Sequence, residues 1–332
     1  MRLTLPLVIA GVAIAAIPVG AQDPGGLIGL REVARSAKAR AYQGRNVGPE
    51  QTERFSRKVR IGRDGRVSIS NVSGDIVVTG GSGDEVSIEA VKHTRGDRNE
   101  LAGVEIIVEE RAGRVDVRAE HDRYRSNRGR RGDSASVDFT VTVPVSASLD
   151  VHSVSGSLKV TGVRGAVRAE TVSGNVTTAD TPNLEHAKSV SGDVSLTGAA
   201  AEGDLSAGSV SGNITAKGLK ARGLDLGSVS GSVEYAGAIA RNGRYEINSH
   251  SGTVRLMLAN PSGFELTANS FSGSIRSDLP LTIGGDSARE RDPNRGRRRE
   301  GNDAHNMRAT FGDGSATLSI RTFSGDIIIS KR

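Results

Sequence analysis

Residues 170–198 read ETVSGNVTTADTPNLEHAKSVSGDVSLTG and hold two copies of one tetrapeptide, in which an aliphatic residue is followed by Ser, Gly and a small polar residue. The chain contains nine copies, and in three of them His250, Phe271 or Phe323 takes the first place. The motif glycines are Gly74, Gly156, Gly174, Gly192, Gly212, Gly231, Gly252, Gly273 and Gly325. From Gly156 to Gly273 they are 18, 18, 20, 19, 21 and 21 residues apart. This regularity indicates a repeat architecture.

Positions within a copy are counted from the motif glycine as 0. Position −5 is apolar in all nine copies, position −7 in all except the one with Glu185, and position −3 is always Ser, Thr or Asn. This alternation predicts a β-strand. The next apolar positions are −2 and +2, so the parity of the alternation changes at the Ser-Gly pair. We expect a bend there, because glycine accepts positive φ and serine bonds to nearby backbone.

A unit with two short strands and one corner cannot bury its own apolar face, whereas stacked units can. We therefore expect an all-β fold, a parallel β-solenoid of about nine short rungs with an N-terminal β-sheet cap, in which the solenoid repeats after the first rung occupy residues 149–332. Position −3 is expected to form an inward polar ladder and position +2 an aliphatic spine. Glycine, serine and β-branched residues argue against helical repeats. A propeller blade would need about 40 residues.

Two stretches interrupt the period. Between Gly74 and Gly156, alternating runs at 85–92, 104–110, 115–119 and 137–143 predict an N-terminal β-sheet module over residues 64–148, which includes the first rung and caps it. Between Gly273 and Gly325, strands are expected at 279–283 and 307–311, on either side of a charged loop at 286–303 that we expect to be disordered.

The N-terminal residues indicate export. Arg2, an apolar stretch from Leu3 to Val19 and small residues before a cleavage point after Ala21 predict a signal peptide at 1–21. An uncleaved N-terminal anchor is the alternative. Residues 22–63 are basic and are expected to be partly helical or disordered. The expected location is the periplasm, the cell surface or the extracellular space.

The amino-acid composition limits how the interior can be packed and which catalytic and metal sites the chain can form. Glycine accounts for 43 of 332 residues, nearly twice the usual share of about 7%. Aromatic residues make up 3% of the chain, so small and aliphatic side chains must fill a thin interior. The chain has no cysteine, which excludes disulfides, thiolate catalysis and Cys-ligated zinc.

The order of these features resembles a known family. The Val-Ser-Gly-Asp units, the segment NVSGDIVVTGGSGDEVSIEAVKHT (71–94) and the segment TVTVPVSASLDV (140–151) are similar to the bacterial adhesin-like family of β-strand-repeat proteins, a domain of unknown function. The resemblance covers about residues 64–332. It implies an exported envelope protein with a right-handed, β-helix-like body, and it supplies no catalytic residue.

Candidate catalytic and metal-binding residues were sought at position +1, because polysaccharide cleavage needs two carboxylates about 5–9 Å apart. No two consecutive copies both have an acid there. The six histidines form no pair at metal-ligand spacing, and His250 is interpreted as a corner residue. The motif serine occurs nine times, as a structural residue would. We therefore expect no catalytic residue, metal or cofactor.

Two arginine-rich stretches share the pentapeptide Asn-Arg-Gly-Arg-Arg, and guanidinium groups bind phosphate and carboxylate. The candidate anion-binding residues are Arg128, Arg130, Arg131, Arg295, Arg297, Arg298 and Arg299. They predict an anionic envelope lipid or an acidic polysaccharide as partner, and a solvated loop is the alternative. A dedicated nucleic-acid partner is not expected, because Tyr124 is the only nearby aromatic residue to stack on bases.

The sequence thus predicts an exported, non-enzymatic protein that acts by surface interaction or adhesion at the cell envelope. One alternative is a polysaccharide-active enzyme on the same scaffold. Another is a structural element that self-associates through its C-terminal rung, where Ile327–Ile329 would form an open edge guarded by Lys331 and Arg332.

Overall fold

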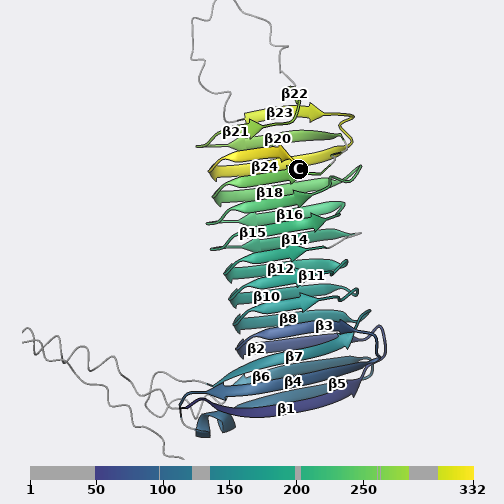
Figure 1. Ribbon diagram of the computed structural model, residues 1–332, viewed down its shortest axis with the longest axis vertical. Helices are drawn as coiled ribbons and strands as arrows, with labels where there is room; N and C mark the ends of the chain where they lie inside the picture. The colour runs from purple at the N-terminus through teal and green to yellow at the C-terminus, as the bar shows by residue number, and fades with distance from the viewer. Residues whose placement is uncertain are drawn as a thin grey trace, which may run out of the picture. The chain divides into compact units, whose positions relative to one another are not determined.

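The computed structural model describes residues 49–96, 98–121, 135–198, 203–259, 261, 263–283 and 306–332, which form an all-β fold of two sheets (Figure 1). The 12-stranded sheet is named sheet A and the 13-stranded sheet is named sheet B. The one helix in this part of the chain is the short 3-10 helix η1 (Arg98–Gly103). Among the described residues, no helix has the length and apolar character needed to cross a membrane.

The neighbouring strands of sheet A are, in order, β1 (Gln51–Arg60), β4 (Glu85–Thr94), β7 (Ser136–Pro144), β3 (Ile76–Gly81), β9 (Leu158–Thr161), β11 (Val176–Ala179), β13 (Val194–Thr197), β15 (Ile214–Leu219), β17 (Val233–Gly237), β19 (Val254–Leu258), β25 (Ile327–Lys331) and β21 (Ile275–Ser277). Those of sheet B are β22 (Thr282–Ile283), β23 (Asn306–Phe311), β20 (Phe264–Ser270), β24 (Ala316–Ser324), β18 (Arg244–Ser251), β16 (Gly223–Ser228), β14 (Asp204–Ser209), β12 (Leu184–Ser191), β10 (Val167–Ser173), β8 (Ser148–Ser155), β2 (Arg66–Ser73), β6 (Arg114–His121) and β5 (Val104–Arg111).

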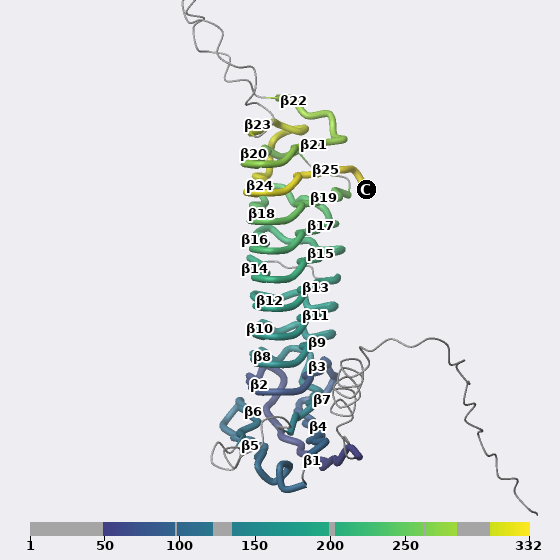
Figure 2. The backbone as a smooth tube through the Cα atoms, turned by 90° about the vertical axis from the view of Figure 1, so that its left-hand side faces the viewer, coloured from purple at the N-terminus to yellow at the C-terminus, as the bar shows by residue number. Residues whose placement is uncertain are grey.

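Each motif copy lies where a strand of sheet B passes into a strand of sheet A. Strand β10 ends at Ser173, for example, and β11 begins at Val176. Like strands of successive units pair in parallel and in register, so that Val176 lies opposite Val194. Figure 2 shows the two resulting columns of strands along the stack. The prediction of an all-β fold with parallel strands is confirmed.

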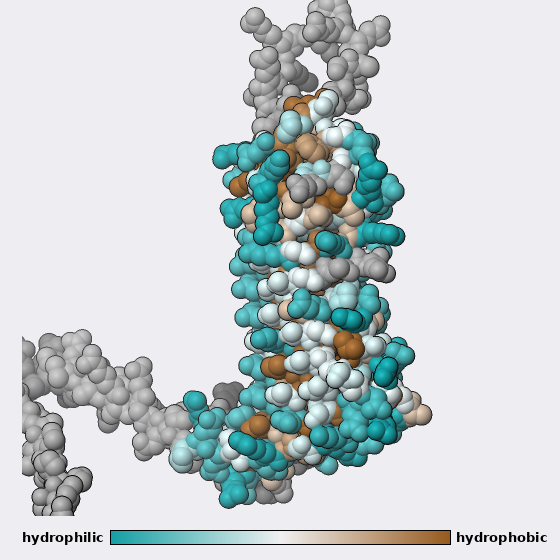
Figure 3. All heavy atoms as spheres, turned by 45° about the vertical axis from the view of Figure 1, so that its right-hand side comes forward, coloured by the Kyte–Doolittle hydropathy of each residue, from teal (hydrophilic) through white to brown (hydrophobic). Residues whose placement is uncertain are grey.

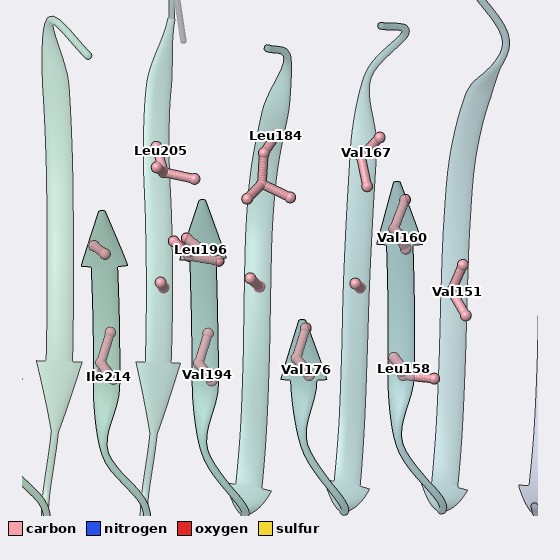
Figure 4. Close-up of a cluster of buried hydrophobic side chains, with 14 of the residues drawn as sticks. Val151, Leu158, Val160, Val167, Val176, Leu184, Val194, Leu196, Leu205 and Ile214 are labelled. Atoms are coloured by element: carbon pink, nitrogen blue, oxygen red, sulfur yellow. The ribbon is translucent and has the colours of Figure 1, made fainter. Parts of the chain in front are cut away.

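The interior lies between the two sheets and is filled by aliphatic side chains. Val151, Leu158, Val176 and Val194 are all at most 1% exposed, and Figure 4 shows the side chains of successive units at matching heights on their strands. Complete burial of such a side chain contributes about 1.5–3 kcal/mol. The spine predicted at position +2 is therefore part of the core.

The copy with Glu185 keeps the core intact by a change of register. Strand β10 pairs Val167 with Leu184 but Arg168 with His186, so Glu185 forms a bulge. Leu184 takes the inward place and is 2% exposed. The bulge thus moves the charged residue out of the core position.

The motif glycines are required mainly by close approach between units. A Cβ atom at Gly192 would lie 2.0 Å from the carbonyl oxygen of Gly174, and one at Gly212 would lie 2.1 Å from that of Gly192. Only Gly74, Gly156 and Gly174 among the nine have a φ in the left-handed region. The expectation that glycine serves the corner through positive φ is therefore wrong for the other six copies.

The polar ladder predicted at position −3 is confirmed. These residues are buried, and in seven of the nine copies the hydroxyl group donates to the carbonyl oxygen of the motif glycine in the neighbouring unit. At the N-terminal end of the stack, the Asn71 amide donates to the carbonyl oxygens of Gly74 and Val137 instead, and the Ser153 hydroxyl has no hydrogen-bond partner among the described residues. The oxygen–oxygen distance is 2.8 Å from Ser189 to Gly174 and 2.9 Å from Ser209 to Gly192. A buried hydroxyl without a partner would cost about 1–3 kcal/mol, so the ladder satisfies a group that the corner must bury.

The stretch between the first two motif copies forms strands β4 to β7. In each sheet these strands pair with one edge of the first unit, and the second unit pairs with the other edge. All four strands predicted there are present. Residues 51–60 correct the expectation for 22–63, because they form β1, antiparallel to β4 at the edge of sheet A. Most of its side chains are exposed, so β1 has little apolar periodicity to reveal it. Residues 22–48 lie outside the described residues.

The C-terminal unit is not at the end of the stack, which corrects the expected open edge at Ile327–Ile329. Strand β24 lies between β18 and β20, and β25 lies between β19 and β21 (Figure 2). Both edges of β25 are paired, so self-association through this strand has no free edge to use. The strands predicted around residues 279–283 and 307–311 are β22 and β23, and the charged loop at 286–303 falls outside the described residues.

Stability should depend on the absence of a side chain at the corner. Gly212→Ala is expected to lower the free energy of unfolding by about 1–3 kcal/mol, because the new methyl group meets backbone rather than a movable side chain. Gly227→Ala is the matched control, since nothing lies within 4 Å of a Cβ at Gly227. Chemical denaturation would measure both changes, and equal stability of the two variants would contradict the close-approach argument.

Candidate functional site

The residues at position −2 form an exposed apolar ridge along one corner of the stack. Position −3 points inward, so position −2 points outward, and the six valines there are 43% to 51% exposed. In spatial order the ridge consists of Val72, Val154, Val172, Val190, Val210, Val229, His250, Phe323 and Phe271. The sequence grouped positions −2 and +2 as apolar, but the structure separates them, with +2 in the core and −2 at the surface.

One end of the ridge is a stack of rings. The His250 and Phe323 ring centroids are 4.9 Å apart with planes at 8°, and those of Phe323 and Phe271 are 4.7 Å apart at 4°. The stack crosses the inserted C-terminal unit, so residues distant in sequence become neighbours. His250 is a corner residue, as expected. Phe271 is 71% exposed, the most exposed side chain of the ridge.

A trough runs beside the ridge along sheet B, because the inward position −3 separates the outward positions −2 and −4. One hollow of 530 Å³ extends along Val172, Val190 and Val210, and a second of 500 Å³ extends along Val229 and Phe323. Both hollows are lined by Gly227, so the trough is continuous from one to the other. Figure 3 shows one side of the stack, where pale, weakly polar residues run along its middle with separate hydrophobic patches among them.

Position −4 forms the far rim of the trough and carries its charges. His152, Glu170 and Lys188 line the first hollow, and Arg321 lines the second. The middle of the rim has no side chain, since Gly208 lies opposite Gly227 there. The trough therefore combines an apolar wall with a rim that is charged toward both ends and open at its centre.

A third hollow, of 930 Å³, lies further across sheet B and brings acids together. Asp225 and Glu246 are paired in register on β16 and β18. Partial desolvation of the Asp225 carboxyl in this hollow raises its pKa, and the Glu246 carboxylate raises it further. The acids at position +1 give no signal for this pair, because Asp225 and Glu246 are at position −6.

The acid and amide side chains at position +1 accept hydrogen bonds from backbone N–H groups of the next unit. Asp75 Oδ1 accepts the N–H of Ser157, and Asp193 Oδ1 accepts the N–H of Asn213, at 2.8 and 2.7 Å. The N–H and hydroxyl of Ser274 donate to Asp326 and lower the pKa of its carboxyl. These contacts support a structural role for position +1. Among the described residues, no three His, Asp or Glu side chains group as metal ligands.

The seven candidate anion-binding arginines, Arg128, Arg130, Arg131, Arg295, Arg297, Arg298 and Arg299, all lie outside the described residues. The structure therefore neither brings them together nor separates them.

Comparison with known proteins gives one family. The family model described as Toastrack DUF4097 matches residues 65–330. No curated protein sequence matches the chain.

Similar solved structures include a candidate cell adhesion protein from Clostridium sporogenes, which is 11% identical with a TM-score of 0.26 and alignment over 85% of this chain and 100% of that one. A candidate adhesin from Bacteroides fragilis is 11% identical with a TM-score of 0.35, over 84% and 97% of the two chains. A candidate lipid binding protein from Parabacteroides distasonis is 11% identical with a TM-score of 0.32, over 63% and 91%.

The ridge should be dispensable for folding. Val190→Thr is expected to change the free energy of unfolding by less than about 0.5 kcal/mol, because the added hydroxyl remains in water. The same change at Val194, in the same unit but fully buried, should cost about 1–3 kcal/mol. Thermal or chemical denaturation would compare the two, and a large loss at Val190 would show that the ridge belongs to the core.

Proposed function

The chain belongs to the Toastrack DUF4097 family, and on that premise we propose that it is an exported, non-enzymatic β-solenoid that acts by surface interaction at the bacterial cell envelope. The resemblance recognised in the sequence, to a family of adhesin-like domains of unknown function, is thereby confirmed. The solenoid description is supported by the in-register parallel pairing of successive units, and the nine motif copies correspond to its nine proposed rungs.

The observation that carries this function is the exposed ridge at position −2. Nine side chains in adjacent units span about 38 Å at about 4.8 Å per step. The valine and phenylalanine side chains at this position are 43% to 71% exposed, and folded proteins rarely expose a contiguous apolar patch without an interaction that covers it. The ridge, the trough and the rest of the outer face of sheet B are therefore the proposed contact surface.

The enzymatic alternative would use Asp225 and Glu246, which adjacent strands place side by side along the third hollow. We propose instead that these two acids belong to the polar rim of the contact surface. Asp225 is exposed on the outside of sheet B, and general acid catalysis needs a carboxyl held at a reacting bond within a site that positions the substrate.

The two arginine-rich stretches are a second proposed contact, with an anionic lipid or an acidic polysaccharide as partner. This proposal rests on the repeated pentapeptide and on the ability of guanidinium groups to bind phosphate and carboxylate in a bidentate manner.

The contact surface is tested by photo-crosslinking in the bacterium that produces the protein. A photoreactive residue at Val190 should give a light-dependent product of higher mass, because the ridge is covered in the cell. The matched control is the same residue at Ser195, which lies in the same unit but on sheet A. Absence of a product from Val190, or equal products from both positions, would contradict the proposed surface.

Export is tested separately. Mass spectrometry of the protein recovered from the envelope or the medium should find Gln22 at its N-terminus, because a signal peptidase cleaves after small residues such as Ala21. A chain that retains Met1 in the membrane fraction would favour the uncleaved anchor.

A further inference from the structure

The outer face of sheet B is complementary to itself. We propose that its occupant is a second copy of this chain, bound antiparallel, with a two-fold axis that crosses the face between Gly208 and Gly227. This inference rests on the proposed function, because it names the partner of the same contact surface.

The order of side chains along the rim of the trough supports an antiparallel second copy. In register, from unit to unit, position −4 reads His152, Glu170, Lys188, Gly208, Gly227, Asn248, Arg321 and Asn269. A two-fold axis at the midpoint places each residue opposite the one at the same distance on the other side. Glu170 of one copy then faces Arg321 of the other, twice in each dimer.

The two charged residues are available for this contact. Arg321 is exposed and forms no ion pair with any residue in the described part of the chain. The Glu170 side chain is 45% exposed, and its neighbour His152 lies 3.8 Å away. Charge complementarity of this kind fixes the register of an interface and disfavours other arrangements.

The shape of the rim also leaves room for a second copy. Gly208 and Gly227 leave the rim without side chains at the axis, where the two surfaces come closest. A Cβ at Gly227 would have nothing within 4 Å in its own chain, so the space there is open. Along the ridge the same axis places Val210 opposite Val229 and Val172 opposite Phe323, so apolar groups meet apolar groups there. It also places Val190 opposite the His250 ring, which is the one polar side chain of the ridge.

No like charges oppose each other in the next outward column. At position −6 the axis places His186 opposite Glu246 and Ser206 opposite Asp225. The acidic pair thus faces neutral or basic groups of the second copy.

The size of the face also fits a second copy. From His152 to Asn269 there are seven steps of about 4.8 Å along the stack, and position −8 to position −2 spans about 20 Å along each strand. The face is therefore about 34 Å by 20 Å, or roughly 700 Å², close to the ~800 Å² per partner that a stable interface covers.

The test is a charge exchange in the full chain as recovered from the envelope, with oligomeric state measured by sedimentation equilibrium. The wild-type chain should be a dimer. Glu170→Arg and Arg321→Glu should each raise the dimer dissociation constant by about tenfold or more, because each places like charges together twice. The double variant should restore association. Arg255→Glu, an exposed change on sheet A, is the matched control and should leave the dimer intact.

Circular dichroism and the thermal midpoint would establish that the variants fold. A monomeric wild-type chain, single variants that dimerise like the wild type, or a double variant that fails to recover would each overturn the inference. Photo-crosslinking at Val190 distinguishes failure of the dimer inference from failure of the proposed function. A product whose mass is not twice that of the chain overturns the second copy alone, whereas no product overturns both.

Discussion

At every motif corner, neighbouring units approach until a Cβ atom at one glycine would lie 2.0–2.2 Å from a backbone carbonyl oxygen of the next unit. This contact forces glycine at position 0, and it leaves the glycine oxygen within reach of the hydroxyl at position −3. Register between units follows, because a shift by one residue would place a side chain against that oxygen. The core, the polar ladder and the exposed ridge repeat regularly because the geometry of this corner is the same in every unit.

Much of the fold could be predicted from the sequence, because the corner imposes its residue types in every copy. The alternation at −7, −5 and −3 predicted the strands, and Ser, Thr or Asn at −3 predicted the buried ladder. The order of units could not be predicted. The spacing of 21 residues from Gly252 to Gly273 equals the spacing before it, yet the unit of Gly325 lies between them. The residues around Gly252 and Gly273 give no local sequence signal that a unit distant in sequence lies between them.

The candidate site was predicted less well. Position −2 is aliphatic or aromatic, and hydropathy alone cannot distinguish an outward valine from an inward one when the alternation changes parity at the corner. The acids Asp225 and Glu246 lie in a column that carries Ser, Thr, Arg, His and one further acid, Asp150, in the other copies, so its residue type is not repeated from copy to copy. The edge strand β1 was missed because its side chains are mostly polar and exposed.

The inserted C-terminal unit has a consequence for the order of folding. A stack whose units follow the chain can be completed step by step as residues leave the ribosome or the translocation channel. Here residues 264–277 cannot take their final neighbours until residues 316–331 have arrived, because β24 and β25 must lie between them and the preceding unit. Removal of β24 and β25 would therefore open a gap inside the stack, because these two strands close the molecule from within.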